Sequence, residues 1–114
     1  MKERDDLPYL RHILDAIGRI ESYVSGVDEG DFLGNAEKQD AVIRQLQIVG
    51  EAAKRLSAEL RAAHPDIPWR EVAGMRDKLV HDYFGVDLRF VWVTVTEDIP
   101  DFKARIEAIL EDRS

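Results

Sequence analysis

One arginine, one histidine and one tyrosine, Arg76, His81 and Tyr83, lie within a run of eight residues. The guanidinium of Arg76 can bind a phosphate through two parallel hydrogen bonds. The imidazole of His81 takes up and releases protons near neutral pH. The phenol of Tyr83 can donate or accept a hydrogen bond, or carry a modification. Together these three groups favour chemistry on a phosphodiester bond.

Each of these groups also has an ordinary structural explanation. A single arginine or histidine on a helix is usually solvated or held in a polar contact, and Tyr83 can be a core aromatic with its hydroxyl at the surface. Asp77 precedes His81 by one helical turn, where its carboxylate can orient the imidazole and favour its charged form. The same pair can be a surface contact worth a few tenths of a kcal/mol, so Asp77 is a supporting candidate.

Helical geometry limits how these groups can meet. On an ideal helix Arg76 and Tyr83 share one face, whereas Asp77 and His81 share another. A straight helix therefore cannot bring all three groups to one point. Either the helix loosens before Gly85, or another helix or a second copy of the chain completes the site. A dimer interface would also supply two imidazoles, and phosphodiester cleavage needs both a base and an acid.

The composition is typical of a soluble, cytoplasmic protein. A chain of 114 residues fits one domain, here residues 1–114, built around one core. The absence of cysteine excludes a disulfide framework, a thiolate metal site and a cysteine nucleophile. No signal peptide and no membrane-spanning apolar stretch is visible. No set of His, Asp and Glu residues resembles a metal site, and there is no glycine-rich phosphate loop, so we expect neither a metal ion nor a cofactor.

The net charge of −7 argues against broad binding to duplex nucleic acid, which depends on an excess of Lys and Arg. If RNA is the substrate, the contact must be local. Arg70, Lys78 and Arg89 surround the motif in the sequence and, with Arg76, can form a small positive island. Glu51 is a further candidate, because its charge lies within a helix among small residues and must face either solvent or a polar site. The acidic remainder leaves room for a basic partner protein.

The hydrophobic pattern predicts an all-α protein, an antiparallel bundle of four main helices. Asp5 or Asp6 caps the first helix, Gly26 ends it, and Asp87 caps the last. Residues 27–34 are expected to form a polar connection with a short turn at Asp31. The expected helices cover about residues 5–25, 35–64 and 72–84, followed by one long helix from residue 88 onward.

Two local features qualify this pattern. Trp69 is expected to fill the core from a turn at residues 69–72. A hydrophobic repeat near 3.5 continues through Pro100, so we expect one helix kinked there, although the β-branched residues 91–96 would favour a strand locally. The wide apolar stripes of the first and last helices are expected to bury part of their area against a second copy, which makes a homodimer.

The run Arg76-x-x-x-x-His81-x-Tyr83 resembles the Arg-x4-His-x-Tyr signature of the HEPN superfamily, in its HepT-like toxin branch. Three flanking steps, Pro68-Trp69, Gly74-Met75-Arg76 and Asp98-Ile99-Pro100, are also similar to that branch, as is the segment of residues 48–53 around Glu51. The resemblance covers nearly the whole chain. It implies a helical bundle that dimerises, with the motif near the dimer interface.

The resemblance also implies a function, that of a metal-independent ribonuclease toxin. The 2′-hydroxyl of RNA would attack the adjacent phosphate, with His81 as general base or acid and Arg76 stabilising the developing charge. The partner would be a small nucleotidyltransferase antitoxin of the MNT type, which silences the toxin by transferring AMP to Tyr83. The alternative is a non-catalytic helical module that pairs with a nucleotidyltransferase and binds nucleotide at Arg76 and Tyr83.

Overall fold

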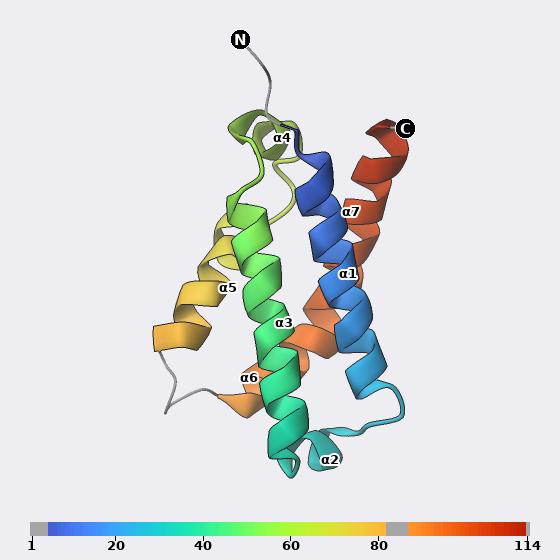
Figure 1. Cartoon of the computed structure of the whole chain (residues 1–114), viewed down its shortest axis with the longest axis vertical. Coiled ribbons are helices and arrows are strands. Elements are labelled where there is room, and N and C mark those ends of the chain that lie inside the picture. Colours follow the sequence, from blue (N-terminus) through green and yellow to red (C-terminus); the bar gives the residue numbers. More distant parts are fainter. Residues whose placement is uncertain (1–4, 82–86, 114) are drawn as a thin grey trace.

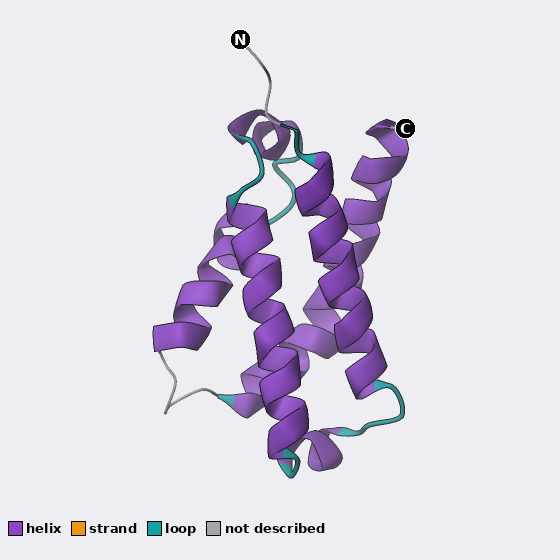
Figure 2. Ribbon diagram, in the orientation of Figure 1, coloured by secondary structure: helices purple, strands orange, loops and turns teal. Residues whose placement is uncertain are grey.

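The computed structural model describes residues 5–81 and 87–113, without the side chains of residues 76, 80, 81 and 113. Regular structure in these ranges is entirely helical (Figure 2). None of the described helices is long and apolar enough to cross a membrane. The helices are α1 (Leu7–Val24), α2 (Glu29–Leu33), α3 (Ala36–Lys54), α4 (Ala58–Ala63), α5 (Trp69–His81), α6 (Leu88–Val93), the π-helix η1 (Thr94–Asp98) and α7 (Ile99–Arg113).

Four long helical segments run alternately up and down the molecule (Figure 1). They are α1, α3, α5 and the continuous run of α6, η1 and α7. Helix α3 packs against α1 on one side and α5 on the other, and α7 packs against α1. The predicted all-α antiparallel bundle of four main helices is confirmed for the described residues.

The core is formed where the apolar stripes of α1, α3 and α7 meet. Burial of these side chains removes apolar surface from water at roughly 25 cal/mol per Å², which drives the packing of the long helices. The three- and four-residue spacing of the stripes is the spacing predicted from the sequence. The completely or almost completely buried residues include Leu10, Ile13, Ile17 and Ile20 of α1, Val42, Leu46 and Val49 of α3, and Ile106 of α7.

The two aspartates before α1, Asp5 and Asp6, make different hydrogen bonds. Asp5 accepts a hydrogen bond at its Oδ1 from the backbone N–H of Leu7, at 3.1 Å, and so stabilises the start of the helix. Asp6 is buried, and its two carboxylate oxygens accept hydrogen bonds from the backbone N–H and the hydroxyl of Ser57, each at 2.7 Å. At the other end of α1, Gly26 adopts a positive φ of 73°, which favours glycine, as predicted for a helix stop.

The prediction of one helix over residues 35–64 is wrong in the middle of this segment, because the segment divides into α3 and α4. Ser57 adopts an extended backbone and its hydroxyl caps α4 by accepting a hydrogen bond from the N–H of Leu60. The same hydroxyl donates to Asp6, so a contact between distant parts of the sequence fixes the break. The predicted start at Asn35 and the end near His64 are confirmed.

The connection predicted for residues 27–34 contains a short helix, α2. Asp28 and Asp31 form a capping box at its start, in which each side chain bonds the other residue's backbone N–H. Phe32 is fully buried and its ring lies 5.3 Å from that of Trp92, centre to centre. Burial of Phe32 explains why this polar segment folds onto the bundle.

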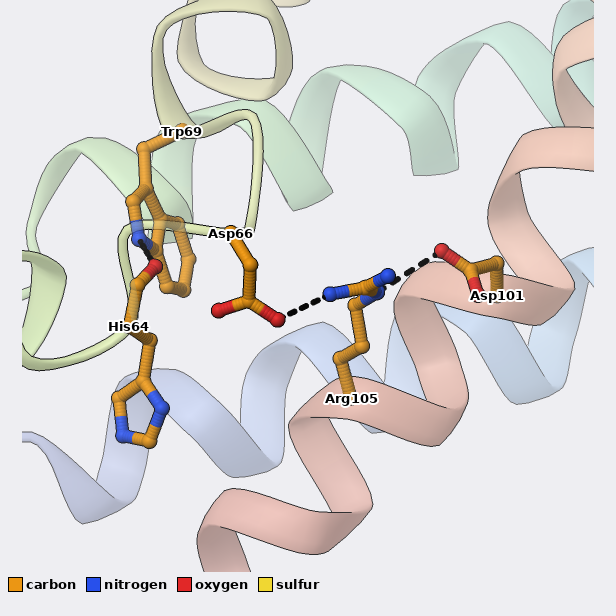
Figure 3. A network of polar contacts seen from close by, with 5 residues as sticks. All are labelled: His64, Asp66, Trp69, Asp101 and Arg105. Carbon is orange, nitrogen blue, oxygen red and sulfur yellow. Dashed lines mark hydrogen bonds and ion pairs between the residues drawn. The ribbon is translucent and has the colours of Figure 1, made fainter.

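Helix α5 begins at Trp69, three residues before the predicted start. Trp69 is in the core as predicted, but residues 69–72 form the first helical turn, in which the N–H of Val72 bonds the carbonyl of Pro68. The indole N–H of Trp69 donates to the carbonyl of His64 at 2.9 Å (Figure 3). Its ring meets that of Phe102 edge-on, with 6.1 Å between the centres.

Two ionic contacts fasten α7 to the rest of the bundle. Arg105 bonds both Asp101, one turn earlier in α7, and Asp66 in the connector that precedes α5 (Figure 3). The hydrogen bond and charge of Asp101, with a smaller effect from Asp66, raise the pKa of Arg105 above its ordinary value. Lys103 lies 3.0 Å from the carboxylate of Glu21 and so joins α7 to α1.

The helical run continues through Pro100, and the strand alternative for residues 91–96 is excluded. The sequence predicts a kink at Pro100, and the structure has a π-helix that ends two residues before this proline, in which the N–H of Ile99 bonds the carbonyl of Thr94, five residues earlier. The hydroxyl of Thr94 donates to the carbonyl of Phe90 at 2.8 Å, and the same carbonyl accepts from the backbone N–H of Thr94. Asp87 caps α6 as predicted, through the N–H groups of residues 89 and 90.

Candidate active site

Arg76 and His81 of the motif belong to α5, which the core holds through buried side chains one helical turn apart. Met75 and Leu79 are both buried, and Trp69 anchors the first turn. Helix α5 also packs against α3. The backbone that carries Arg76 and His81 is therefore fixed relative to the bundle.

The side chains of Arg76 and His81, and the whole of Tyr83, lie outside the described residues, as do the expected helix end at Phe84 and stop at Gly85. Their predicted roles stay predictions. The backbone is helical through His81, so Arg76 and His81 are five helical positions apart, about 140° around the axis. These two positions therefore lie on different sides of the helix axis, and the faces that their side chains occupy stay a prediction.

The predicted supporting groups occupy different surroundings. Asp77 is partly buried in α5 and takes part in an interaction with another residue. The ammonium group of Lys78 lies 4.0 Å from the centre of the Phe90 ring, a cation–π contact that joins α5 to α6. Arg89 is exposed beside Phe90, and Arg70 is exposed at the start of α5, about 12 Å along the helix axis from Lys78.

A groove of about 560 Å³ separates α5 from η1 and α7, and we call it the α5–α7 groove. Apolar side chains, among them Met75, Phe90 and Phe102, line it. Lys78 and Arg105 are its cations, and Arg105 already bonds two carboxylates. Four carboxylates give the lining a net negative charge, which opposes phosphate binding; they belong to Glu71, Glu97, Asp98 and Asp101.

A second groove, of about 660 Å³, lies between α1 and α3, and we call it the α1–α3 groove. Glu51 lines it, is exposed, and places its Oε1 3.7 Å from Nη2 of Arg55. Glu51 therefore faces a polar groove, one of the two surroundings expected for it. The other lining residues are Tyr9, His12, Arg44, Gln47, Ile48, Ala52 and Arg55.

Sequence reasoning missed the two arginines of this groove. Arg44, Glu51 and Arg55 occur at spacings of seven and four residues, which place them on one face of α3. This spacing was visible in the sequence, but nothing there showed that α1 lies beside that face. Within residues 5–81 and 87–113, no group of three or more His, Asp and Glu side chains is placed to hold a metal ion.

Comparison with known proteins identifies the family. The model of the family described as ribonuclease HepT-like matches residues 13–109. A probable ribonuclease HepT of Thermococcus cleftensis is 48% identical over 107 residues, which cover 94% of this chain and 97% of that protein. A putative RNase of Caldanaerobacter subterraneus is 42% identical over 104 residues, which cover 91% of this chain and 93% of the relative.

Another relative spans an even larger share of the chain. A putative RNase of Methanocaldococcus jannaschii is 41% identical over 112 residues, which cover 98% of this chain and 97% of the relative. No solved structure gives a significant match. The resemblance indicated by the motif and its flanking segments is confirmed, and the chain belongs to the HepT-like ribonuclease family.

Proposed function

We propose that this protein is an endoribonuclease that cleaves RNA without a metal ion, as the toxin of a toxin–antitoxin system. The observation that supports the proposal is the Arg76–His81–Tyr83 motif, of which Arg76 and His81 belong to a core-anchored helix, in a chain whose relatives are named ribonucleases over nearly its whole length. The proposed unit is a homodimer of one HEPN-like domain spanning residues 1–114, located in the cytoplasm.

The proposed chemistry is an internal phosphoryl transfer. One imidazole takes the proton from the 2′-hydroxyl as the bond between the 2′-oxygen and phosphorus forms. The bond between phosphorus and the 5′-oxygen breaks, and a protonated imidazole gives its proton to the leaving oxygen. His81 and His81 of the partner subunit would fill these two roles, while Arg76 stabilises the charge on the phosphate oxygens. Asp77, one turn before His81, would orient the imidazole.

The proposed control is modification of Tyr83. An MNT-type nucleotidyltransferase antitoxin would transfer AMP from ATP to the phenol oxygen, which loses its proton, while the bond between the α- and β-phosphates breaks and pyrophosphate leaves. The added group carries a negative phosphodiester close in sequence to Arg76, so it would compete with RNA phosphate for that guanidinium and block the site sterically.

The net charge of −7 favours a second candidate function. An acidic protein attracts RNA weakly at long range. The alternative is therefore a non-catalytic helical module that pairs with a nucleotidyltransferase and binds nucleotide at Arg76 and Tyr83. Such a module would form a tight complex with its partner and leave the RNA pool intact.

The test is cleavage of RNA by the purified protein in excess EDTA. We expect cleavage products that end in a 2′,3′-cyclic phosphate, and His81→Ala should abolish them while circular dichroism shows an unchanged helical fold. His64→Ala is the matched control, because His64 makes its described hydrogen bonds through its backbone N–H and carbonyl, which the substitution keeps. Intact RNA at high protein concentration, or equal activity in His81→Ala, would rule out the proposed catalysis.

A growth experiment separates the two candidates in the cell. Expression of the chain alone should arrest growth, and expression with a neighbouring nucleotidyltransferase gene should restore it. Growth unaffected by the chain alone, together with a stable complex, would favour the binding module.

A further inference from the structure

The α1–α3 groove carries a local charge opposite to that of the whole protein. Its lining holds two arginines, Arg44 and Arg55, and one carboxylate, that of Glu51. With histidine neutral, this is a net positive groove on a protein of charge −7. The α5–α7 groove, by contrast, has four carboxylates and two cations. Of the two grooves, the α1–α3 groove is the one that suits an anion.

The two arginines are spaced along one edge of the groove. Ile48 follows Arg44 by four residues on α3, and Arg55, the C-cap of α3, follows it by eleven. The three residues share a face, and Arg44 and Arg55 are separated by about 16 Å along the axis. Arg44 is exposed and makes no ion pair within the described part of the chain. Arg55 is held near Glu51, at 3.7 Å, with both side chains half exposed. Separate guanidinium groups of this kind suit a chain of phosphates better than a single one.

The opposite wall, from α1, is aromatic. The rings of Tyr9 and His12 meet edge to face, with 6.2 Å between their centres and 89° between their planes. Ile48 and Ala52 add apolar surface, and Gln47 lies partly buried between the charged residues. An aromatic and apolar wall opposite cations is the arrangement that binds single-stranded nucleic acid, because bases stack on rings while phosphates meet the cations.

We propose that the α1–α3 groove binds single-stranded RNA outside the catalytic motif, with phosphates on Arg44 and Arg55 and a base against Tyr9 and His12. This inference rests on the proposed ribonuclease function. The volume of about 660 Å³ is in the range of pockets that enclose a ligand of nucleotide size. Unpaired bases are required, because paired bases offer no free face to the ring of Tyr9.

A second copy of the chain is the competing occupant, and the surface favours RNA. The large apolar side chains that the described surface exposes most are Phe90 and Val93, at 40% and 41%. Both belong to α6, away from the lining of the α1–α3 groove. A contact between copies would gain more from covering that apolar surface than from covering a charged groove.

The test measures binding with a probe that cannot be cleaved, a fluorescein-labelled 2′-O-methyl RNA of twelve nucleotides. The variants are Arg44→Ala and Arg19→Ala, which remove the same charge from the same fold. Arg19 is exposed on α1 and paired with Asp15, and it does not line the groove. We expect Arg44→Ala to weaken binding about fivefold near 0.1 M salt and to reduce the slope of log K against log salt by about 0.7. Arg19→Ala should match the wild type.

Each outcome decides one question. Equal affinities for Arg44→Ala and Arg19→Ala, or no binding by the wild type, overturn the groove proposal, even if RNA is cleaved normally. An Arg44→Ala protein that changes its sedimentation behaviour while binding RNA normally assigns the groove to a contact between copies and also overturns it. Weaker RNA binding by Arg44→Ala, with unchanged binding by Arg19→Ala, supports the proposed RNA site in the α1–α3 groove. If the wild type then fails to cleave RNA, only the proposed catalysis is lost.

Discussion

Replacement of Asp6 by alanine should destabilise the bundle far more than its position near the chain start suggests. The Asp6 carboxylate is 4% exposed and accepts two hydrogen bonds from Ser57, both at 2.7 Å. Ser57 lies 51 residues later in the sequence, where α3 gives way to α4. Asp6→Ala therefore removes the contact that fixes the start of α1 to the break between two other helices.

The magnitude follows from the two donors that lose their acceptor. Hydrogen bonds to charged groups contribute roughly 1.5–3 kcal/mol each, and a buried donor left unsatisfied costs about 1–3 kcal/mol. Ser57 is only partly buried, so water can reach it after the change, and removal of a buried carboxylate returns its desolvation cost. The net loss should be about 2–3 kcal/mol of unfolding free energy, which lowers Tm by roughly 8–12 °C for a chain of this size.

The assay is urea and thermal unfolding followed by circular dichroism, with Asp40→Ala as control. Asp40 is exposed in α3, so its loss should change stability by less than about 0.5 kcal/mol. The double variant with Ser57→Ala separates the shared contact from the cap that Ser57 supplies to α4. We expect a coupling energy of at least about 1 kcal/mol between the two sites. Additive effects, or an Asp6→Ala protein as stable as Asp40→Ala, would refute the reasoning.

Two further changes test the helix ends. Gly26→Ala should lower the free energy of unfolding by about 1 kcal/mol, because φ at this residue is 73°. Nothing lies within 4 Å of the added methyl group, so the loss measures backbone strain alone. An unchanged Tm would contradict this prediction. Thr94→Val keeps the shape of a buried side chain but leaves the carbonyl of Phe90 without its hydroxyl donor. Urea unfolding should show a loss of about 1 kcal/mol, whereas Thr96→Val, at an exposed position, should lose less.

Local signals explain the parts of the fold that could be predicted. The boundaries of α1 follow from Pro8 in its first turn and Gly26 after its last. Asp87 caps α6 through two backbone N–H groups two and three residues later, as an N-cap residue does. The helical repeat on both sides of Pro100 outweighs the strand preference of the β-branched residues before it. Proline has no backbone N–H to donate, and the π-helix before it lets the helical run continue.

Long-range contacts explain the parts of the fold that could not be predicted from the sequence. Leu56 and Leu60 are both buried and keep the helical repeat across the break between α3 and α4, so the pattern predicted one helix. Ser57 as a cap was a visible signal, but its extended backbone is fixed by Asp6, which the sequence does not place beside it. The sequence likewise places Phe32 in a connection, because nothing in it shows that the partner ring, Trp92, lies beside this segment.

The candidate site divides in the same way. Arg76, His81 and Tyr83 could be singled out because their types and spacing carry the chemistry within one run. Arg44 and Arg55 carry no such signal in the sequence, because the groove that they line is formed only when α1 packs beside α3. A functional surface built from one segment is accessible to sequence reasoning, whereas a groove between two helices needs their packing.

The distribution of charge reconciles an acidic protein with an RNA substrate. At physiological ionic strength the Debye length is about 8 Å, so exposed charges farther apart than this are largely screened from one another. A phosphate close to Arg44 therefore responds to that guanidinium more than to carboxylates on the opposite side of a molecule 50 × 29 × 21 Å in extent. The acidic α5–α7 groove, in turn, disfavours phosphate between α5 and α7. In the proposed groove a single strand would lie along the α3 side of the bundle, where Glu51 belongs to the helix that packs against α5.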